Sequence, residues 1–228
     1  MIVRNIVNIS WFTLFYFLFF SCNTKNDVAS SDQPVTTVID AYPFYFAKEF
    51  VGKLKKQGVD TILFSECICI NCCEFFNVFW VSKGQRYLNN INALGNKTVS
   101  SIIPINNDSV FSKLFEYYDT LKKSRVKDNE FKNKDGNIVQ IVIDHYCYGI
   151  LKIYLAKDSI ITREISDDAF EKFVPFAPDT GGLYPNINYK ENLSSKWNLL
   201  LVEIDSTLAK MPGVSPREKG ALRTRKQF

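Results

Sequence analysis

The sequence is poor in the residues and loops on which most enzyme families depend. Its 228 residues include a single histidine, His145, and ten glycines. Neither a glycine-rich phosphate loop nor a Gly-x-Ser-x-Gly turn occurs along the chain. Asp179-Thr180-Gly181 matches the aspartic-protease triplet, but no second triplet supplies the carboxylate that must share its proton. We interpret it as a turn, and the sequence favours a binding or scaffolding protein over an enzyme.

The main part of the chain also lacks an excess of charge of either sign. The chain has 28 basic and 24 acidic residues. Six of the basic residues and one acid lie within 210–228, so the remaining residues hold 22 basic and 23 acidic groups. A nucleic-acid-binding domain normally presents a basic face, and we therefore expect no nucleic-acid partner. The segment 212–228 is expected to form a basic, disordered tail.

Only one stretch of the sequence is continuously apolar, and it lies near the N-terminus. It runs from Ile9 to Phe20 and follows a single basic residue, Arg4. A helix that crosses a bilayer needs about 20 apolar residues, so twelve are too few. A short apolar stretch behind a basic start is typical of a secretory signal peptide, which we place at residues 1–21.

The end of this apolar stretch, Phe19-Phe20-Ser21-Cys22, resembles a bacterial lipobox. The chain is similar in this respect to uncharacterised lipoproteins of the Bacteroidota type. The resemblance implies that the chain is cut before Cys22, that Cys22 is acylated with palmitate-type chains, and that the protein is anchored to the outer membrane. Residues 22–37 are polar, which predicts a flexible tether.

The body of the chain, residues 38–211, is expected to form a single α+β domain. Helical spacing of apolar residues predicts helices near 43–57, 108–123 and 191–210. Asp40 is the expected N-cap of the first helix, and Asp108 or Ser109 that of the second. Val110, Phe111, Leu114, Phe115, Tyr118 and Leu121 form the expected apolar stripe of the second helix.

Between these helices the pattern predicts strands joined in hairpins. They span 61–70, 75–82 and 85–91, with Lys83-Gly84 as a tight turn, and 138–148, 149–156 and 160–164. Because the strands come in hairpins and not between crossover helices, we expect an antiparallel sheet packed by two or three amphipathic helices.

Cysteine is the one unusual feature of the body. The chemistry-bearing residues are Cys67, Cys69, Cys72 and Cys73, followed by His145 and Cys147. Side chains alternate along a strand, so Cys67 and Cys69 are expected on one face, as are the later histidine and cysteine. If the two strands are neighbours, these groups could form a tetrahedral site for zinc or Cu(I).

Other interpretations of the cysteines remain open. Exported proteins meet oxidising conditions, which favours structural disulfides. Because five cysteines follow Cys22, at least one thiol stays free or pairs with another chain. Buried thiols that act as small apolar groups are a further alternative. A redox motif at Cys69-Ile70-Asn71-Cys72 lacks the helix start that would lower a thiol pKa.

Two functional hypotheses follow from these patterns. The first is a lipid-anchored protein of the cell envelope that binds a ligand or another envelope protein and holds no cofactor. The alternative is a metal- or thiol-dependent envelope protein that uses the cysteine cluster with His145 and Cys147.

Overall fold

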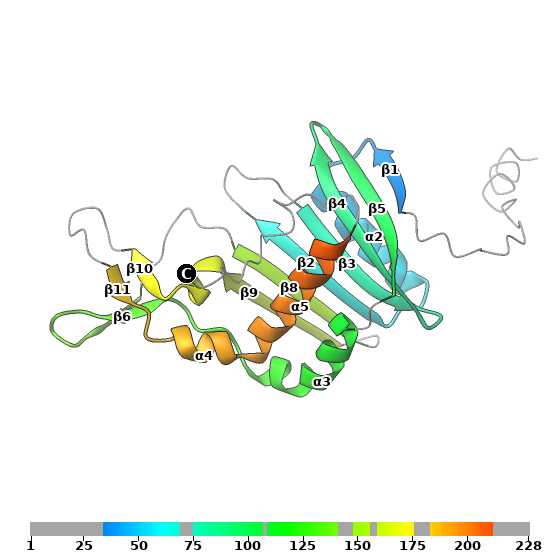
Figure 1. The fold of residues 1–228 in the computed structure, drawn as a ribbon. Helices are drawn as coiled ribbons and strands as arrows, with labels where there is room; N and C mark the ends of the chain where they lie inside the picture. Colours follow the sequence, from blue (N-terminus) through cyan, green and yellow to red (C-terminus); the bar gives the residue numbers. More distant parts are fainter. Residues whose placement is uncertain are drawn as a thin grey trace, which may run out of the picture. The chain divides into compact units, whose positions relative to one another are not determined.

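The fold is built on one antiparallel sheet of seven strands (Figure 1). The structure is a computed structural model that describes residues 34–68, 75–106, 109–140, 148–155, 159–175 and 183–211. The strands are β1 (Val35–Ile39), β2 (Thr61–Ile68), β3 (Phe75–Ser82), β4 (Gln85–Leu94), β5 (Lys97–Ile105), β8 (Tyr148–Leu155) and β9 (Ser159–Ser166). Their order across the sheet is β1-β5-β4-β3-β2-β8-β9. The expected α+β class, with hairpins in an antiparallel sheet, is confirmed.

Helices cover both faces of this sheet. α2 (Pro43–Lys56) packs on one face, where Ala47, Val51 and Leu54 are buried. α3 (Ser109–Lys123) and α5 (Lys196–Lys210) pack on the other face. Side chains of a strand alternate between faces, so Phe79 lies beneath α3 and α5 while Trp80 lies beneath α2. Both faces of the β3–β4 hairpin are therefore apolar and covered, as its sequence predicts.

The helix boundaries correct three expectations. α2 is preceded by Tyr42 and has no side-chain cap, so Asp40 does not cap it. In α3 Phe115 is 52% exposed, and Tyr117 is buried in its place. Ser195 caps α5 by accepting a hydrogen bond from the amide of Asn198, and its extended backbone divides the expected 191–210 helix into α4 (Tyr189–Ser194) and α5. The other expected cap, Asp108, lies outside the described residues.

Two strands of the sheet were not expected from the sequence. β1 includes residues 35–37, which the sequence assigned to the tether, because their neighbour on the sheet is β5. β5 contains Pro104, which lacks a backbone donor and argues against a central strand. The pairing between β1 and β5 stops at Ile102 of β5. Pro104, two residues further along β5, therefore has a neighbouring strand only on its β4 side.

A smaller part of the fold extends from the β9 side of the sheet. It comprises the hairpin of β6 (Glu130–Lys132) and β7 (Ile138–Gln140), the pair β10 (Phe173–Pro175) and β11 (Leu183–Pro185), the 3-10 helix η1 (Asp167–Phe170), and α4. We call this the accessory region. β7 pairs with β6 and not with β8, so the expected meander of three strands from residue 138 onward is wrong at its first strand. The pairing partner, β6, lies in a segment too polar to be recognised as a strand.

Asparagine side chains hold the accessory region together. The amide of Asn192 donates to the carbonyls of Lys127 and Ala169, and its oxygen accepts from the amide of Lys127. Asn188 donates to the carbonyl of Asp128 and to the carboxylate of Glu130. These bonds satisfy backbone groups that no regular ladder reaches, so the buried asparagines here have a structural explanation.

Candidate functional site at one end of the central sheet

Buried polar side chains gather at one end of the central sheet, where β2 and β4 finish and β3, β5 and β8 begin. We call this the polar end. Its buried members are Ser65, Glu66, Asn77, Asn89, Asn90, Thr98 and Ser100, and the half-buried Asn92 and Ser101 adjoin them. The strand register shows where apolar residues give way to polar ones. Leu63, Phe79 and Leu88 lie opposite one another across β2, β3 and β4, and the next residues on the same face are Ser65, Asn77 and Asn90.

On the α5 side of the sheet, the asparagines bond to one another. Asn90 Nδ2 donates to Asn77 Oδ1 at 2.8 Å, and both residues are at most 2% exposed. Asn92 Nδ2 donates to Asn90 Oδ1, while Asn92 Oδ1 is buried without a hydrogen-bond partner among the described residues. The strand backbones already pair within the ladder, so these amides are not needed to satisfy the backbone.

A second polar pair lies on the α2 side of the same end. Ser100 Oγ donates to Asn89 Oδ1 at 2.8 Å. Asn89 is completely buried, and its Nδ2 has no hydrogen-bond partner within the part of the chain that the structure describes. A buried amide without a partner is unfavourable by about 1–3 kcal/mol, so this position is also poorly explained by stability.

The same face holds a buried ion pair between neighbouring strands. Lys152 Nζ on β8 lies 3.2 Å from Glu66 Oε2 on β2, and the Glu66 side chain is 2% exposed. Burial raises the pKa of the Tyr154 phenol, and the Glu66 carboxylate raises it further. Lys55 of α2 lies with its ammonium 3.6 Å from the centre of the Tyr154 ring, and burial lowers the pKa of Lys55.

The chemistry of this end is hydrogen bonding and charge pairing. The amides offer donors and acceptors of neutral charge, and the one buried carboxylate is matched by Lys152. Among the described residues, no group of three or more His, Cys, Asp or Glu side chains is placed to hold a metal ion. The arrangement therefore suits recognition of a polar group.

Most of the residues that the sequence singled out lie outside the described residues. These are Cys22, Cys69, Cys72, Cys73, His145 and Cys147. The backbone of Cys67 is described and lies on β2, opposite Gly149 of β8. The last pair of this ladder is Ile68 with Tyr148, so β2 and β8 are neighbours. The metal hypothesis requires β2 to lie beside the expected 138–148 strand, and residues 141–147 of that segment lie outside the described residues. The ligand set itself stays a prediction.

Sequence reasoning missed the polar end, although a signal was present. The run Leu88-Asn89-Asn90-Ile91-Asn92 places two asparagines inside the strand expected over 85–91 and a third directly after it. Asparagine is depleted in strands, so three asparagines within four residues of a strand are an unusual cluster. Nothing in the sequence around Glu66 marks its pairing, because its partner Lys152 lies 86 residues further along the chain.

Further comparisons do not add a family or an activity. Matching the chain against protein-family models, curated proteins and solved structures finds nothing similar. In the described part of the chain, no helix is both long and apolar enough to cross a bilayer.

Proposed function

We propose that the protein is a lipid-anchored binding module of the cell envelope whose binding region is the polar end of its sheet. The observation that carries the proposal is the bonded row of Asn77, Asn90 and Asn92, of which Asn77 and Asn90 are buried where the backbone needs no side-chain partner. The anchor rests on the lipobox-like Ser21-Cys22. Burying polar groups that no backbone requires lowers stability, and such departures are typical of functional sites.

The chemistry of the row indicates the class of ligand. Side-chain amides hold donors and acceptors side by side, and they pair with hydroxyl or amide groups of a partner. The asparagine row carries no charge, so it suits an uncharged ligand such as a sugar or a peptide backbone. An envelope protein meets both classes in the cell wall and at the cell surface.

The binding region can be tested with a triple substitution that removes the row. Asn77→Leu, Asn90→Leu and Asn92→Leu together replace every member of the bonded group, so none of them is left without a partner. We expect the triple variant to stay folded and to lose the saturation-transfer NMR signals that the unaltered protein gives with soluble muropeptides or oligosaccharides. The reverse result, full signals from the triple variant, would place binding elsewhere.

The anchor can be tested separately by metabolic labelling. Cells that express the full chain and are fed alkyne-palmitate should yield a labelled protein of the mass expected after cleavage before Cys22. Cys22→Ser should abolish both the label and the cleavage, whereas Ser21→Ala should keep them, because the cysteine sulfur forms the thioether bond to the diacylglyceryl group that carries the labelled acyl chains. Persistent labelling of the Cys22→Ser variant would contradict the anchor.

A metal- or thiol-dependent protein is the second candidate. The pairing of β2 with β8 favours it, because Cys67 lies on β2 and Cys147 directly precedes the first residue of β8. Residues 23–228, made in an oxidising compartment, should then show a native mass excess of one zinc or Cu(I) ion. After removal of the metal, all five thiols should react with an alkylating agent. One reactive thiol, two disulfides and no metal would make the cysteines structural.

A further inference from the structure

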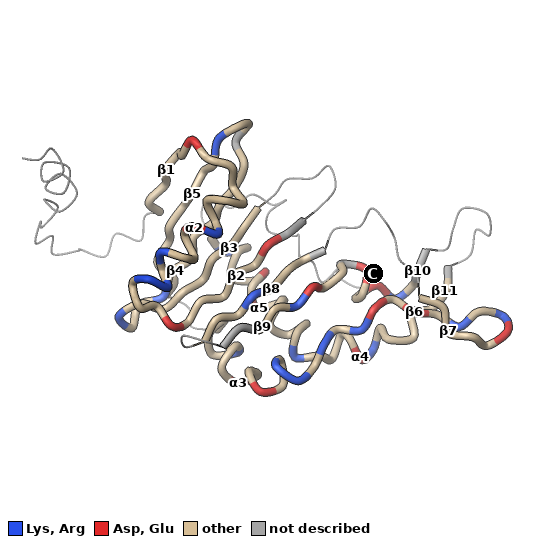
Figure 2. The backbone as a smooth tube through the Cα atoms, turned by 180° about the vertical axis from the view of Figure 1, so that it is seen from behind, with Lys and Arg blue, Asp and Glu red and all other residues tan. Residues whose placement is uncertain are grey.

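The outward face of α2 differs in charge from those of the other two long helices. α2 carries Lys48, Lys53, Lys55 and Lys56 against one acid, Glu49. α3 has three lysines and two acids, and α5 has two of each. Figure 2 shows the basic residues of α2 as a run of blue toward the C-terminal end of the helix. Among these three helices, only α2 has an excess of three positive charges, and α2 covers one face of the sheet.

Exposed aromatic rings accompany these lysines. Tyr45 is 70% exposed, the largest value among the exposed large hydrophobic residues of the described chain. Its ring lies 6.1 Å from that of Tyr42 and 5.5 Å from that of Phe44. The ammonium of Lys48 lies 3.8 Å from the centre of the Phe44 ring. Tyrosine and lysine side by side are typical of surfaces at a lipid headgroup layer, where the rings enter the interface and the ammonium groups meet phosphates.

The first strand of the sheet presents a side chain on the α2 face. Val35, the first residue of β1, is exposed and pairs with Ile102, a residue that packs in the cluster beneath α2. Eleven residues separate Cys22 from Pro34. Such a segment spans at most about 40 Å, and about 18 Å if flexible, so a chain anchored at Cys22 can bring the α2 face to the bilayer.

We propose that the outward face of α2 rests on anionic lipid headgroups, with Lys48, Lys53 and Lys56 paired to their phosphates. The inference depends on the lipid anchor proposed above, because the anchor sets the distance. The ion pair of Lys53 with Glu49 is exposed, and exposed pairs are weak, so a phosphate can replace the carboxylate. Docking of this face holds the sheet at a set orientation to the membrane and leaves the accessory region free to project from it.

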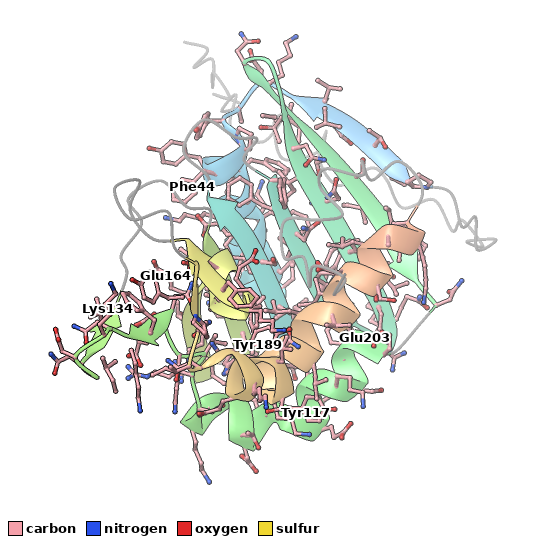
Figure 3. All side chains as sticks on the ribbon, turned by 60° about the vertical axis from the view of Figure 1, so that its left-hand side comes forward. Phe44, Tyr117, Lys134, Glu164, Tyr189 and Glu203 are labelled. Carbon is pink, nitrogen blue, oxygen red and sulfur yellow. The ribbon has the colours of Figure 1, made fainter. Side chains whose placement is uncertain are left out.

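Lysine reactivity in vesicles tests this orientation. The acylated full-length mature protein is reconstituted in phosphatidylcholine vesicles with and without phosphatidylglycerol and treated with a membrane-impermeant acetylating reagent. We expect acetylation of Lys48, Lys53 and Lys56 to slow by about fivefold, as pairing with an anionic surface predicts, only with phosphatidylglycerol and only at low salt. Lys134, on the β6–β7 turn away from α2, serves as the internal standard (Figure 3).

Charge-reversed variants provide the control. Lys53→Glu with Lys56→Glu should remove the protection of Lys48, whereas Lys122→Glu with Lys123→Glu, the matched pair at the end of α3, should leave it. Thermal unfolding confirms that both variants are folded. Equal acetylation rates in the two kinds of vesicle, protection in phosphatidylcholine alone, or loss of protection in the α3 variant would each overturn the docking.

Flotation with the vesicles separates the two proposals. Protein that floats while its α2 lysines stay reactive retains the anchor and contradicts the docking. Protein that does not float contradicts the anchor, and the docking fails with it. Protein that floats with protected α2 lysines supports both.

Discussion

The buried asparagines of the accessory region and those of the polar end have different hydrogen-bond partners. In the accessory region, Asn186, Asn188 and Asn192 bond to backbone groups of irregular chain. At the polar end of the sheet, Asn77 and Asn90 bond to each other across two strands whose backbones are already paired. The same side chain is therefore required for folding in one region and is unexplained by folding in the other.

The difference shows how a buried polar residue can be sorted into structure or function. A side chain that satisfies a backbone group has no replacement, because the backbone group remains when the side chain is removed. Side chains that satisfy only one another can be removed together at little cost in stability. The distinction is measurable by substitution and equilibrium unfolding.

Asn192→Leu should destabilise the protein most. The substitution removes three hydrogen bonds: it takes away the side-chain partner of both the amide and the carbonyl of Lys127, and leaves the Ala169 carbonyl with only the longer bond from Asn186. We expect the free energy of unfolding to fall by about 3–5 kcal/mol, measured as a lower urea midpoint with an unchanged slope. Asn96→Ala, at an exposed turn between β4 and β5, should change the midpoint little. A small effect at Asn192 would contradict its structural role.

Breaking the buried ion pair should have the next largest effect. Lys152→Met leaves the Glu66 carboxylate buried without its partner, and we expect a loss of about 2–4 kcal/mol. Adding Glu66→Gln removes the buried charge and should restore most of the stability. A double-mutant cycle of urea unfolding measures this coupling. Additive losses would show that the two residues act independently.

The asparagine row should respond in the same non-additive way. Asn90→Leu alone leaves Asn77 Oδ1 and Asn92 Nδ2 without partners and should cost about 1–3 kcal/mol. The triple variant with Asn77→Leu and Asn92→Leu should lie within about 1 kcal/mol of the unaltered protein or exceed its stability. A triple variant less stable than the single one would make this row structural and remove its contrast with the accessory region.

The smallest expected effect concerns alkaline pH. The folded state raises the pKa of Tyr154 above its ordinary value of 10.0, so the neutral phenol is favoured on folding. Its contribution to stability is complete below pH 10 and is lost as the pH rises through the folded pKa. Lys55 acts in the opposite sense, because its pKa is lowered and the cost of its buried charge disappears as the pH rises.

Tyr154→Phe separates these two contributions. The unfolding free energy of the variant should decline less steeply above pH 10 than that of the unaltered protein. Urea titrations at a series of alkaline pH values measure the two slopes. Parallel curves would show that Tyr154 contributes nothing to the alkaline loss.

Much of the fold follows from local pattern. Alternation of apolar residues predicts the β3–β4 hairpin and its two covered faces, and Lys83-Gly84 adopts the positive φ angles that its turn requires. Helical spacing predicts the buried residues Trp197, Leu200 and Ile204 of α5. These features depend on near neighbours in the chain, which a sequence displays directly.

The candidate site was less predictable. Residues 65, 77 and 90 belong to three strands, and only the register of the sheet places them side by side. A single asparagine in a strand is unremarkable, and its significance depends on whether water or another side chain faces it. The contact between Glu66 and Lys152 joins positions 86 residues apart, so no local pattern reports it.

The sequence by itself determined the α+β class, the main hairpin and the long helices, because periodicity and turn chemistry are local properties. Only the tertiary structure decided that residues 35–39 complete the sheet, that β2 lies beside β8, and that the asparagines meet at one end. These results depend on pairing between distant segments. Such pairing is set by the burial and hydrogen bonding of the whole sheet and not by any one segment.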